Sequence, residues 1–280
     1  MACHNGYKPN TMNQFTEDNQ VEQPAIDLFQ SLGWETINAY DEVLASDGNE
    51  GTLGRSTRDE VVLRSRLRAK LRQFNPDVPE EQIEEAVKEL SRDRSSMHEV
   101  RANKEVYDLM REGVDVQYRD RDGRLIEKTL KVIDWQQPRN NDYLLVSQLW
   151  VSGVYGNKRP DLVAFINGLP VVLFELKKTG RSVRDAYEGN ISDYQDTIPQ
   201  LFWYNQVIIL SNGADTKVGT ITSPWEFYGE WKKISDEEEP GIVSLETAIR
   251  GICDKKLLLD LLEHFILFED TRANPKKLFA

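Results

Sequence analysis

Two short apolar runs separated by Asn167-Gly168 constrain the fold of this chain more than any other feature. The first run covers residues 162–166 and the second covers residues 169–174. Asn-Gly between β-branched and aromatic residues is a strong local signal for a β-hairpin. Because apolar residues occupy both faces of each expected strand, other elements should cover both faces. The sequence therefore predicts a buried hairpin inside a layered α/β fold.

Three charged side chains stand at the open end of this hairpin. Asp161 precedes the first strand, and Glu175 and Lys177 end the second. Glu175 and Lys177 are two positions apart, so on a strand they share one face. Charged groups on an otherwise apolar hairpin are costly to bury unless they are paired or used in chemistry. We therefore take these three residues as the leading candidates for a functional site.

The register of the hairpin decides whether Asp161 joins the other two residues. With a two-residue loop and regular pairing, Asp161 lies opposite Phe174, and Glu175 points to the other face. With a three-residue loop over residues 167–169, or with a β-bulge, Asp161 lies opposite Glu175. We expect the three-residue loop or the bulge, because either of them gathers the charges.

The chemistry that suits this group is metal-assisted hydrolysis of a phosphodiester. Two carboxylates a few ångströms apart repel each other and attract a hard divalent cation, which we expect to be Mg²⁺. Such a metal lowers the pKa of a bound water and polarises a phosphoryl oxygen. Lys177 can hold the attacking water or stabilise charge on the phosphate. The alternative is an ordinary charged cluster that ends a surface hairpin.

Arg159-Pro160-Asp161, separated by thirteen residues from Glu175-Leu176-Lys177, resembles the P-D…(D/E)-x-K motif of nucleases. Longer strings make the resemblance more specific. They are Asn-Gly-Leu-Pro at 167–170, Glu-Leu-Lys-Lys at 175–178, Ile-Pro-Gln-Leu-Phe at 198–202, Tyr-Asn-Gln at 204–206 and Ser-Asn-Gly at 211–213. From about residue 17 onward, the chain is similar to the N-terminal nuclease region of the restriction (R) subunit of type I restriction–modification enzymes.

This resemblance implies an α/β fold with a PD-(D/E)xK restriction-endonuclease-like core, in which helices flank a mixed β-sheet, together with additional helices. It implies Mg²⁺-dependent cleavage of double-stranded DNA in which Asp161, Glu175 and Lys177 are catalytic and the two carboxylates bind the metal. In the family, cleavage is coupled to translocation by ATP-driven motor domains, so ATP is expected only in the full-length subunit. The expected partners are the methyltransferase and specificity subunits of the restriction complex.

The resemblance also implies roles for two helices. The family carries a glutamate that points at the metal site from a helix before the sheet. Glu22, on a helix expected over residues 17–32, is the best match and a further catalytic candidate; the alternative is a solvated glutamate. Family members also carry a glutamine and, four residues on, a tyrosine that supports cleavage coupled to translocation. Asn190 and Tyr194 match by position, with a shorter amide. Gln200 and Tyr204 match the literal spacing, so both pairs remain candidates.

Two other readings compete with the nuclease. One is a catalytically silent, nuclease-like docking module for motor or methyltransferase subunits, and the other is a standalone repair or recombination nuclease. The formal net charge of −12 keeps the docking module open, because affinity for phosphate needs clustered basic residues. The one clear basic run lies on a helix expected over residues 56–74. Its Arg64, Arg68 and Arg72 could contact DNA or a partner subunit, or could simply face solvent.

The rest of the chain divides into a disordered tail (residues 1–15), a nuclease domain (16–270) with a helical insertion at about 56–112, and a linker toward absent motor domains (271–280). Within the domain we expect helices over residues 80–90, 96–111, 180–197 and 257–268, a hairpin within 114–135, and buried strands within 141–151 and 206–210. Cys3 and Cys253 have no motif spacing and are expected as free thiols. No signal peptide or membrane-spanning run is apparent, so we expect a cytoplasmic protein.

Overall fold

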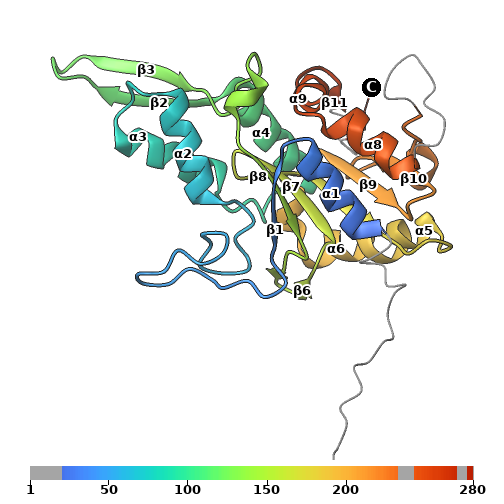
Figure 1. Cartoon of the computed structure of the whole chain (residues 1–280). Coiled ribbons are helices and arrows are strands. Elements are labelled where there is room, and N and C mark those ends of the chain that lie inside the picture. The colour runs from blue at the N-terminus through green and yellow to red at the C-terminus, as the bar shows by residue number, and fades with distance from the viewer. Residues whose placement is uncertain (1–20, 233–242, 270–275, 280) are drawn as a thin grey trace, which may run out of the picture.

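A mixed six-stranded β-sheet forms the centre of the molecule, in the order β1-β4-β7-β8-β9-β10 (Figure 1). The computed structural model describes residues 21–232, 243–269 and 276–279. The strands are β1 (Glu35–Asn38), β4 (Tyr143–Ser147), β7 (Leu162–Ile166), β8 (Leu169–Leu176), β9 (Val207–Ser211) and β10 (Thr216–Gly219). β1 and β4 run parallel, as do β8 and β9, and the other neighbours are antiparallel. The expected α/β fold with a mixed sheet is confirmed.

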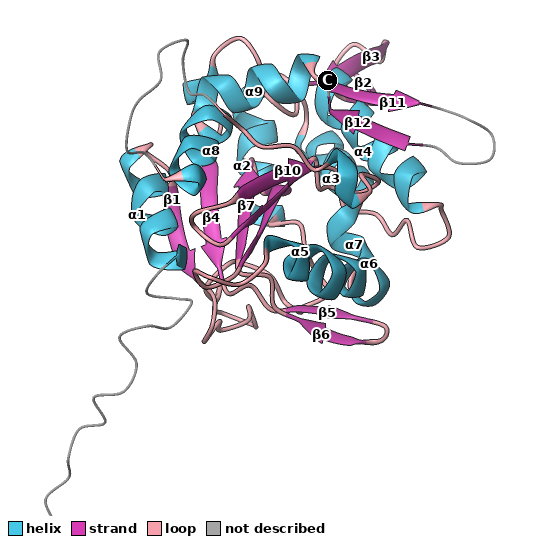
Figure 2. Ribbon diagram, turned by 90° about the vertical axis from the view of Figure 1, so that its right-hand side faces the viewer, coloured by secondary structure: helices cyan, strands magenta, loops and turns pink. Residues whose placement is uncertain are grey.

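Helices cover both faces of this sheet. Figure 2 shows α1 (Gln23–Ser31) and α8 (Ser244–Cys253) on one side, and α5 (Val183–Asp185) and α6 (Ser192–Thr197) on the other. Every residue of β4, β7, β8 and β9 is buried as a result. This agrees with the apolar residues that the sequence places on both faces of these strands.

A helical insertion separates β1 from β4. It contains α2 (Arg64–Phe74), α3 (Glu80–Leu90), α4 (Glu99–Glu112) and the antiparallel hairpin of β2 (Val114–Arg119) and β3 (Leu125–Leu130). Figure 1 shows the hairpin projecting beyond α2 and α3. The expected start of the arginine-rich helix at residue 56 is wrong. Before Arg64 the backbone bonds to distant segments instead: Arg58 O accepts from Ser152 N–H of β5 at 3.0 Å, and Leu63 N–H donates to Gly168 O of the β7–β8 turn at 2.9 Å.

The helix expected over residues 180–197 is interrupted by a π-helical turn, η3 (Ala186–Ile191), between α5 and α6. A short α7 (Pro199–Phe202) then leads into β9. Two single turns of 3₁₀ helix, η2 (Pro138–Asn140) and η4 (Trp225–Phe227), and the small hairpin of β5 (Val151–Gly153) and β6 (Gly156–Lys158) complete this part of the fold.

The C-terminal part differs from the sequence prediction. α9 (Lys255–His264) ends before residue 268, because residues 266–269 form β11 (Ile266–Glu269), which pairs with β12 (Lys276–Phe279). α8 has no counterpart among the predicted helices. Residues 276–279, expected in a linker, are thus part of the fold, whereas the expected disordered tail and Cys3 lie outside the described residues. Cys253 is a buried free thiol.

A buried lysine fixes β12 against the rest of the protein. Lys277 Nζ donates hydrogen bonds to Asn103 Oδ1 at 2.8 Å, Asn205 O at 2.9 Å and Gln206 Oε1 at 2.5 Å. Burial lowers the pKa of Lys277 well below its usual value. Three acceptors match the three donors of an ammonium group and offset its desolvation.

Within the described ranges, no helix has the length and apolar character required to cross a bilayer.

Candidate active site

The hairpin of β7 and β8 gathers the charged residues by means of a β-bulge. Ile166 pairs with Leu169, so the loop has two residues, and Asn167 and Gly168 adopt φ angles of 51° and 81°. Positive φ at both loop residues is typical of a type I′ turn. The three-residue loop is therefore wrong. The register shifts between Ala164 and Phe165, as the bulge alternative predicts.

The bulge brings the two carboxylates of the candidate site opposite each other. Beyond it, Leu162 pairs with Phe174, which places Asp161 opposite Glu175. The Phe174 ring packs edge to face against Phe29 of α1, with ring centroids 5.5 Å apart. Because neighbouring side chains on a strand point to opposite faces, Glu175 points away from α1, toward the side covered by η3 and α6.

Hydrogen bonds hold the three candidate residues at the end of β8. Asp161 Oδ2 accepts the Leu176 backbone N–H at 2.7 Å, and Lys177 Nζ donates to Glu175 Oε1 at 3.0 Å. Glu175 is only 2% exposed. Burial, together with the charge of Asp161, raises the pKa of Glu175 to about 8, although Lys177 and the nearby Tyr194 oppose this rise.

One carboxylate oxygen of this group is compatible with a hard cation. Glu175 Oε2 is buried and makes no hydrogen bond with any residue that the structure describes. A buried carboxylate oxygen without a donor is costly, and a divalent cation shared with Asp161 would satisfy it. In the described ranges, no three side chains of His, Cys, Asp and Glu gather closely enough to hold a metal. Asp161 and Glu175 would therefore be the side-chain ligands, as the sequence suggests.

Glu22 is connected to Asp161 through Gln148. It is buried just before α1, where its Oε2 accepts the Gln148 side-chain amide at 2.7 Å. The backbone N–H of Gln148 in turn donates to Asp161 O at 2.8 Å. Gln148 therefore links Glu22 to Asp161, and among the described residues Glu22, Asp161 and Glu175 do not form a three-carboxylate cluster.

Gln148 is a site residue that the sequence reading missed. Its φ angle is 57°, which is rare for a residue other than glycine and is maintained only where the surroundings enforce it. It directly follows β4, and its side chain and its backbone bridge Glu22 and Asp161. Nothing local in the sequence marks this conformation, because no glycine, asparagine or turn motif occupies the position.

Two residue pairs are candidates for coupling cleavage to translocation, Asn190–Tyr194 and Gln200–Tyr204, and their surroundings differ. Asn190 Nδ2 donates to the Tyr194 hydroxyl at 3.3 Å. Burial raises the pKa of Tyr194, and the nearby charges of Glu175 and Asp161 raise it further. Gln200 instead donates to Ser152 O at 2.7 Å, and the Tyr204 hydroxyl donates to Leu90 O at 2.9 Å. Only the Asn190–Tyr194 pair therefore lies beside the charged residues.

The arginines of α2 follow the turn end of the β7–β8 hairpin, whereas Asp161 and Glu175 lie at its open end. α2 begins at the Asn167-Gly168 turn, through the bond from Leu63 N–H to Gly168 O. The strand rise places that turn about 17 Å from Asp161. Arg68 and Arg72 form ion pairs with Glu84 and Glu80, and Arg64 lies 3.5 Å from Glu60. These contacts favour the alternative of a paired surface over a DNA contact.

Comparison with known proteins gives a consistent picture. A family model described as "Type I restriction enzyme R protein N terminus" matches residues 14–227. The chain is 32% identical over 259 residues to the type I restriction enzyme HindI endonuclease subunit of Haemophilus influenzae, covering 90% of this chain and 24% of that protein. It is 27% identical over 279 residues to the putative type I restriction enzyme MjaIXP endonuclease subunit of Methanocaldococcus jannaschii, covering 91% and 26% respectively. The chain thus spans about a quarter of the length of these relatives.

Proposed function

Because this chain belongs to the family of type I restriction enzyme R protein N termini, we propose that it is the nuclease module of such a protein and cleaves double-stranded DNA with Mg²⁺. The central sheet would be the core of a PD-(D/E)xK restriction-endonuclease-like fold. One observation carries this proposal. The bulged hairpin places Asp161 opposite Glu175, and the buried Oε2 of Glu175 lacks a donor among the described residues.

Each side chain has a separate task in this proposal. Asp161 and Glu175 would hold Mg²⁺, with the Leu176 carbonyl as a further ligand. When bound, the ion would supply Lewis-acid polarisation of a phosphoryl oxygen and a lowered pKa for water at the site. Lys177, held by Glu175, would orient the attacking water or stabilise the negative charge that develops on the phosphate. Because burial raises the pKa of Tyr194, its hydroxyl would stay protonated and would donate a hydrogen bond within the site.

The wider assembly is part of the same proposal. Cleavage would be coupled, through Asn190 and Tyr194, to translocation by ATP-driven motor domains outside this chain. Methyltransferase and specificity subunits would complete the restriction complex. Support comes from the family membership and from relatives named as endonuclease subunits of type I restriction enzymes.

One observation favours a second candidate, a catalytically silent docking module. Asn190 replaces the expected glutamine, and its shorter side chain donates to the Tyr194 hydroxyl. A silent module would retain the fold without needing a metal. Metal binding therefore distinguishes the two candidates.

Titration calorimetry with Mg²⁺ on Asp161→Asn tests the nuclease proposal. The substitution keeps the size of the side chain but removes one of the two charges that attract the cation, so binding should fall by at least about tenfold. Asp115→Asn is the matched control, because Asp115 is an exposed aspartate on β2. We expect the control to bind as the unmodified chain does. Absence of Mg²⁺ binding by the unmodified chain, with and without duplex DNA, would favour the docking module.

Metal affinity should also depend on pH. With its pKa raised to about 8, the folded and metal-free Glu175 carries a proton at neutral pH. Metal binding must displace this proton, so affinity should rise about tenfold per pH unit up to pH 8 and then level off. Calorimetry at pH 6.5 in buffers of different ionisation enthalpy should show release of about one proton. A pH-independent affinity would contradict this assignment.

The proton on Glu175 also affects the stability of the fold. Its contribution falls as the pH rises, whereas metal affinity increases. The folded-state pKa of Glu175 lies above its usual value, so its contribution to the free energy of unfolding is full in acid and is lost as the pH rises to 8. Without metal, Glu175→Gln should remove this contribution, because glutamine cannot lose a proton. A smaller pH dependence from Glu99, whose pKa burial raises to about 7, should remain. Denaturant unfolding at pH 6 and pH 8 measures the difference.

A further inference from the structure

Two arginines share an aromatic platform beside the candidate metal site. The guanidinium carbon of Arg159 lies 4.8 Å from the ring centroid of Tyr40 and 5.0 Å from that of Trp150. The guanidinium carbon of Arg58 lies 5.6 Å from the Trp150 ring centroid. Stacking on aromatic rings fixes the plane of a guanidinium group and leaves the N–H donors at its edge available.

The sheet topology places this platform at the same edge as Asp161. Tyr40 follows β1 and Trp150 follows β4, and these two strands are parallel. β7 is antiparallel to both β4 and β8, so its start lies beside the ends of β4 and β8. Arg159 is two residues before Asp161, and Glu175 is near the end of β8. Platform and carboxylates therefore share one edge of the sheet.

A buried ion pair holds the platform together. Arg55 Nη2 donates to Trp150 O at 2.5 Å, and its Nε donates to Glu42 Oε1 at 2.7 Å. Both ionic side chains are almost completely buried. Since Glu42 lies two residues after Tyr40, this bridge ties the segment after β1 to the segment after β4. The position of the rings is thus set by the fold.

The charges on Arg58 and Arg159 are not neutralised by the described part of the chain. Neither side chain forms an ion pair with a described carboxylate, in contrast to the α2 arginines Arg68 and Arg72. The Nε atom of Arg58 is also buried and makes no hydrogen bond with a described residue. An oriented, partly buried guanidinium without a carboxylate is suited to an external anion.

We propose that Arg58 and Arg159, stacked on Tyr40 and Trp150, bind backbone phosphates of the DNA next to the bond that is cut. This inference rests on the proposed nuclease function and names the residues that would hold its substrate. Two fixed guanidinium groups would each bind phosphate oxygens through paired N–H donors. A local phosphate site of this kind also explains how a chain of net charge −12 can hold DNA, because affinity depends on clustered positive charge at the contact.

Duplex binding by the single variants Arg58→Gln and Arg159→Gln tests this assignment. Fluorescence anisotropy with a short labelled duplex, in Ca²⁺ buffers of increasing salt concentration, gives both the affinity and its salt dependence. Each variant should bind roughly fivefold to tenfold more weakly and lower the slope of log affinity against log salt by about 1, the value expected for one lost phosphate contact. Arg159→Lys keeps the charge and should therefore keep most of the slope.

Arg72→Gln is the matched control, because Arg72 is an exposed arginine on α2, at the other end of the hairpin. It should bind duplex as the unmodified chain does. Thermal unfolding of every variant checks that the fold is intact. Unchanged duplex affinity and salt slope in both platform variants would overturn the assignment, and a loss confined to Arg72→Gln would move the contact to α2.

Magnesium titration of the same variants separates this inference from the function on which it rests. We expect Arg159→Gln to bind Mg²⁺ within about twofold of the unmodified chain, because the two carboxylates are unchanged. Mg²⁺ binding without any duplex binding by the unmodified chain would overturn the phosphate assignment and leave the metal site standing. If the unmodified chain bound neither Mg²⁺ nor duplex DNA, the nuclease function itself would be contradicted.

Discussion

Lys177→Ala should lower the rate of DNA cleavage by the assembled restriction complex by about 10²–10³ while leaving metal binding in place. Lys177 is half-buried, and its ammonium group is held 3.0 Å from Glu175 Oε1, at the edge where Asp161 also lies. Removing one group that stabilises charge developing in a reaction costs about 10²–10³ in rate. Nicking of supercoiled plasmid by the complete complex, with calorimetry of Mg²⁺ binding to the same variant, measures both quantities.

The control for this experiment is Lys256→Ala, on the exposed surface of α9. It removes the same charge from the chain but should leave nicking unchanged. Because Lys177 opposes the raised pKa of Glu175, its removal should raise that pKa further and weaken Mg²⁺ binding modestly at neutral pH. Nicking at the unmodified rate would exclude a catalytic role for Lys177, and loss of Mg²⁺ binding at pH 9 would give it a purely structural one.

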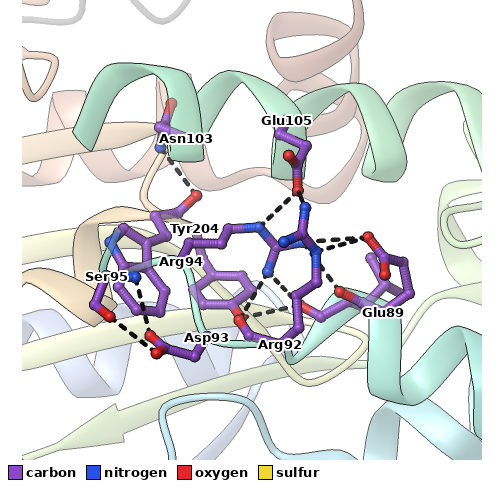
Figure 3. A network of polar contacts seen from close by, with 10 residues as sticks. Glu89, Arg92, Asp93, Arg94, Ser95, Asn103, Glu105 and Tyr204 are labelled. Carbon is purple, nitrogen blue, oxygen red and sulfur yellow. Dashed lines mark hydrogen bonds and ion pairs between the residues drawn. The ribbon is translucent and has the colours of Figure 1, made fainter. Parts of the chain in front are cut away.

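The second large effect concerns stability, and we expect Arg94→Met to lower the free energy of unfolding by about 3 kcal/mol. Figure 3 shows Arg94 at the centre of a polar network in the helical insertion. Its side chain is fully buried and donates to Glu105 Oε1 at 2.9 Å and to the backbone oxygens of Arg92 and Glu89, both at 3.0 Å. Methionine keeps an unbranched apolar chain in the place of the arginine stem but cannot donate to any of these acceptors.

Arg92→Met is the matched control, because Arg92 binds the same Glu105 carboxylate and also bonds to Glu89 at 2.9 Å (Figure 3). Its side chain is 40% exposed, so water can replace it, and we expect a loss below about 1 kcal/mol. Urea unfolding of both variants gives the comparison. Equal losses would show that burial of Arg94 does not determine its contribution.

The β7–β8 hairpin, which carries the candidate site, could be predicted from the sequence because its signals are local. Asn167-Gly168 marks the turn, and the apolar runs on either side mark two strands with both faces covered. The bulge was one of two predicted ways to bring Asp161 opposite Glu175, and the structure uses it. The helices α3 and α4 were likewise predictable from the periodicity of their apolar residues.

The errors arose where contacts between distant segments override local preference. Residues 56–63 continue a helix-like pattern, but their backbone bonds to Gly168 and Ser152 instead. The segment over residues 276–279 reads as a polar linker, yet it pairs with β11 and buries Lys277 beneath acceptors from α4 and the start of β9. A buried lysine gives no local sign of the acceptors that will surround it.

The sequence by itself determined the pair of carboxylates, the lysine and the hairpin that carries them, because turn chemistry, strand alternation and motif spacing act over a few residues. Only the tertiary structure decided which residues support the site and which arginine side chains form ion pairs. Glu22 and Gln148 are 126 positions apart but bond to each other. Arg68 and Arg72 of α2 pair with glutamates on α3, whereas Arg58 and Arg159 stack on aromatic rings. Charge can be counted along a chain, but its pairing depends on which segments the fold brings together.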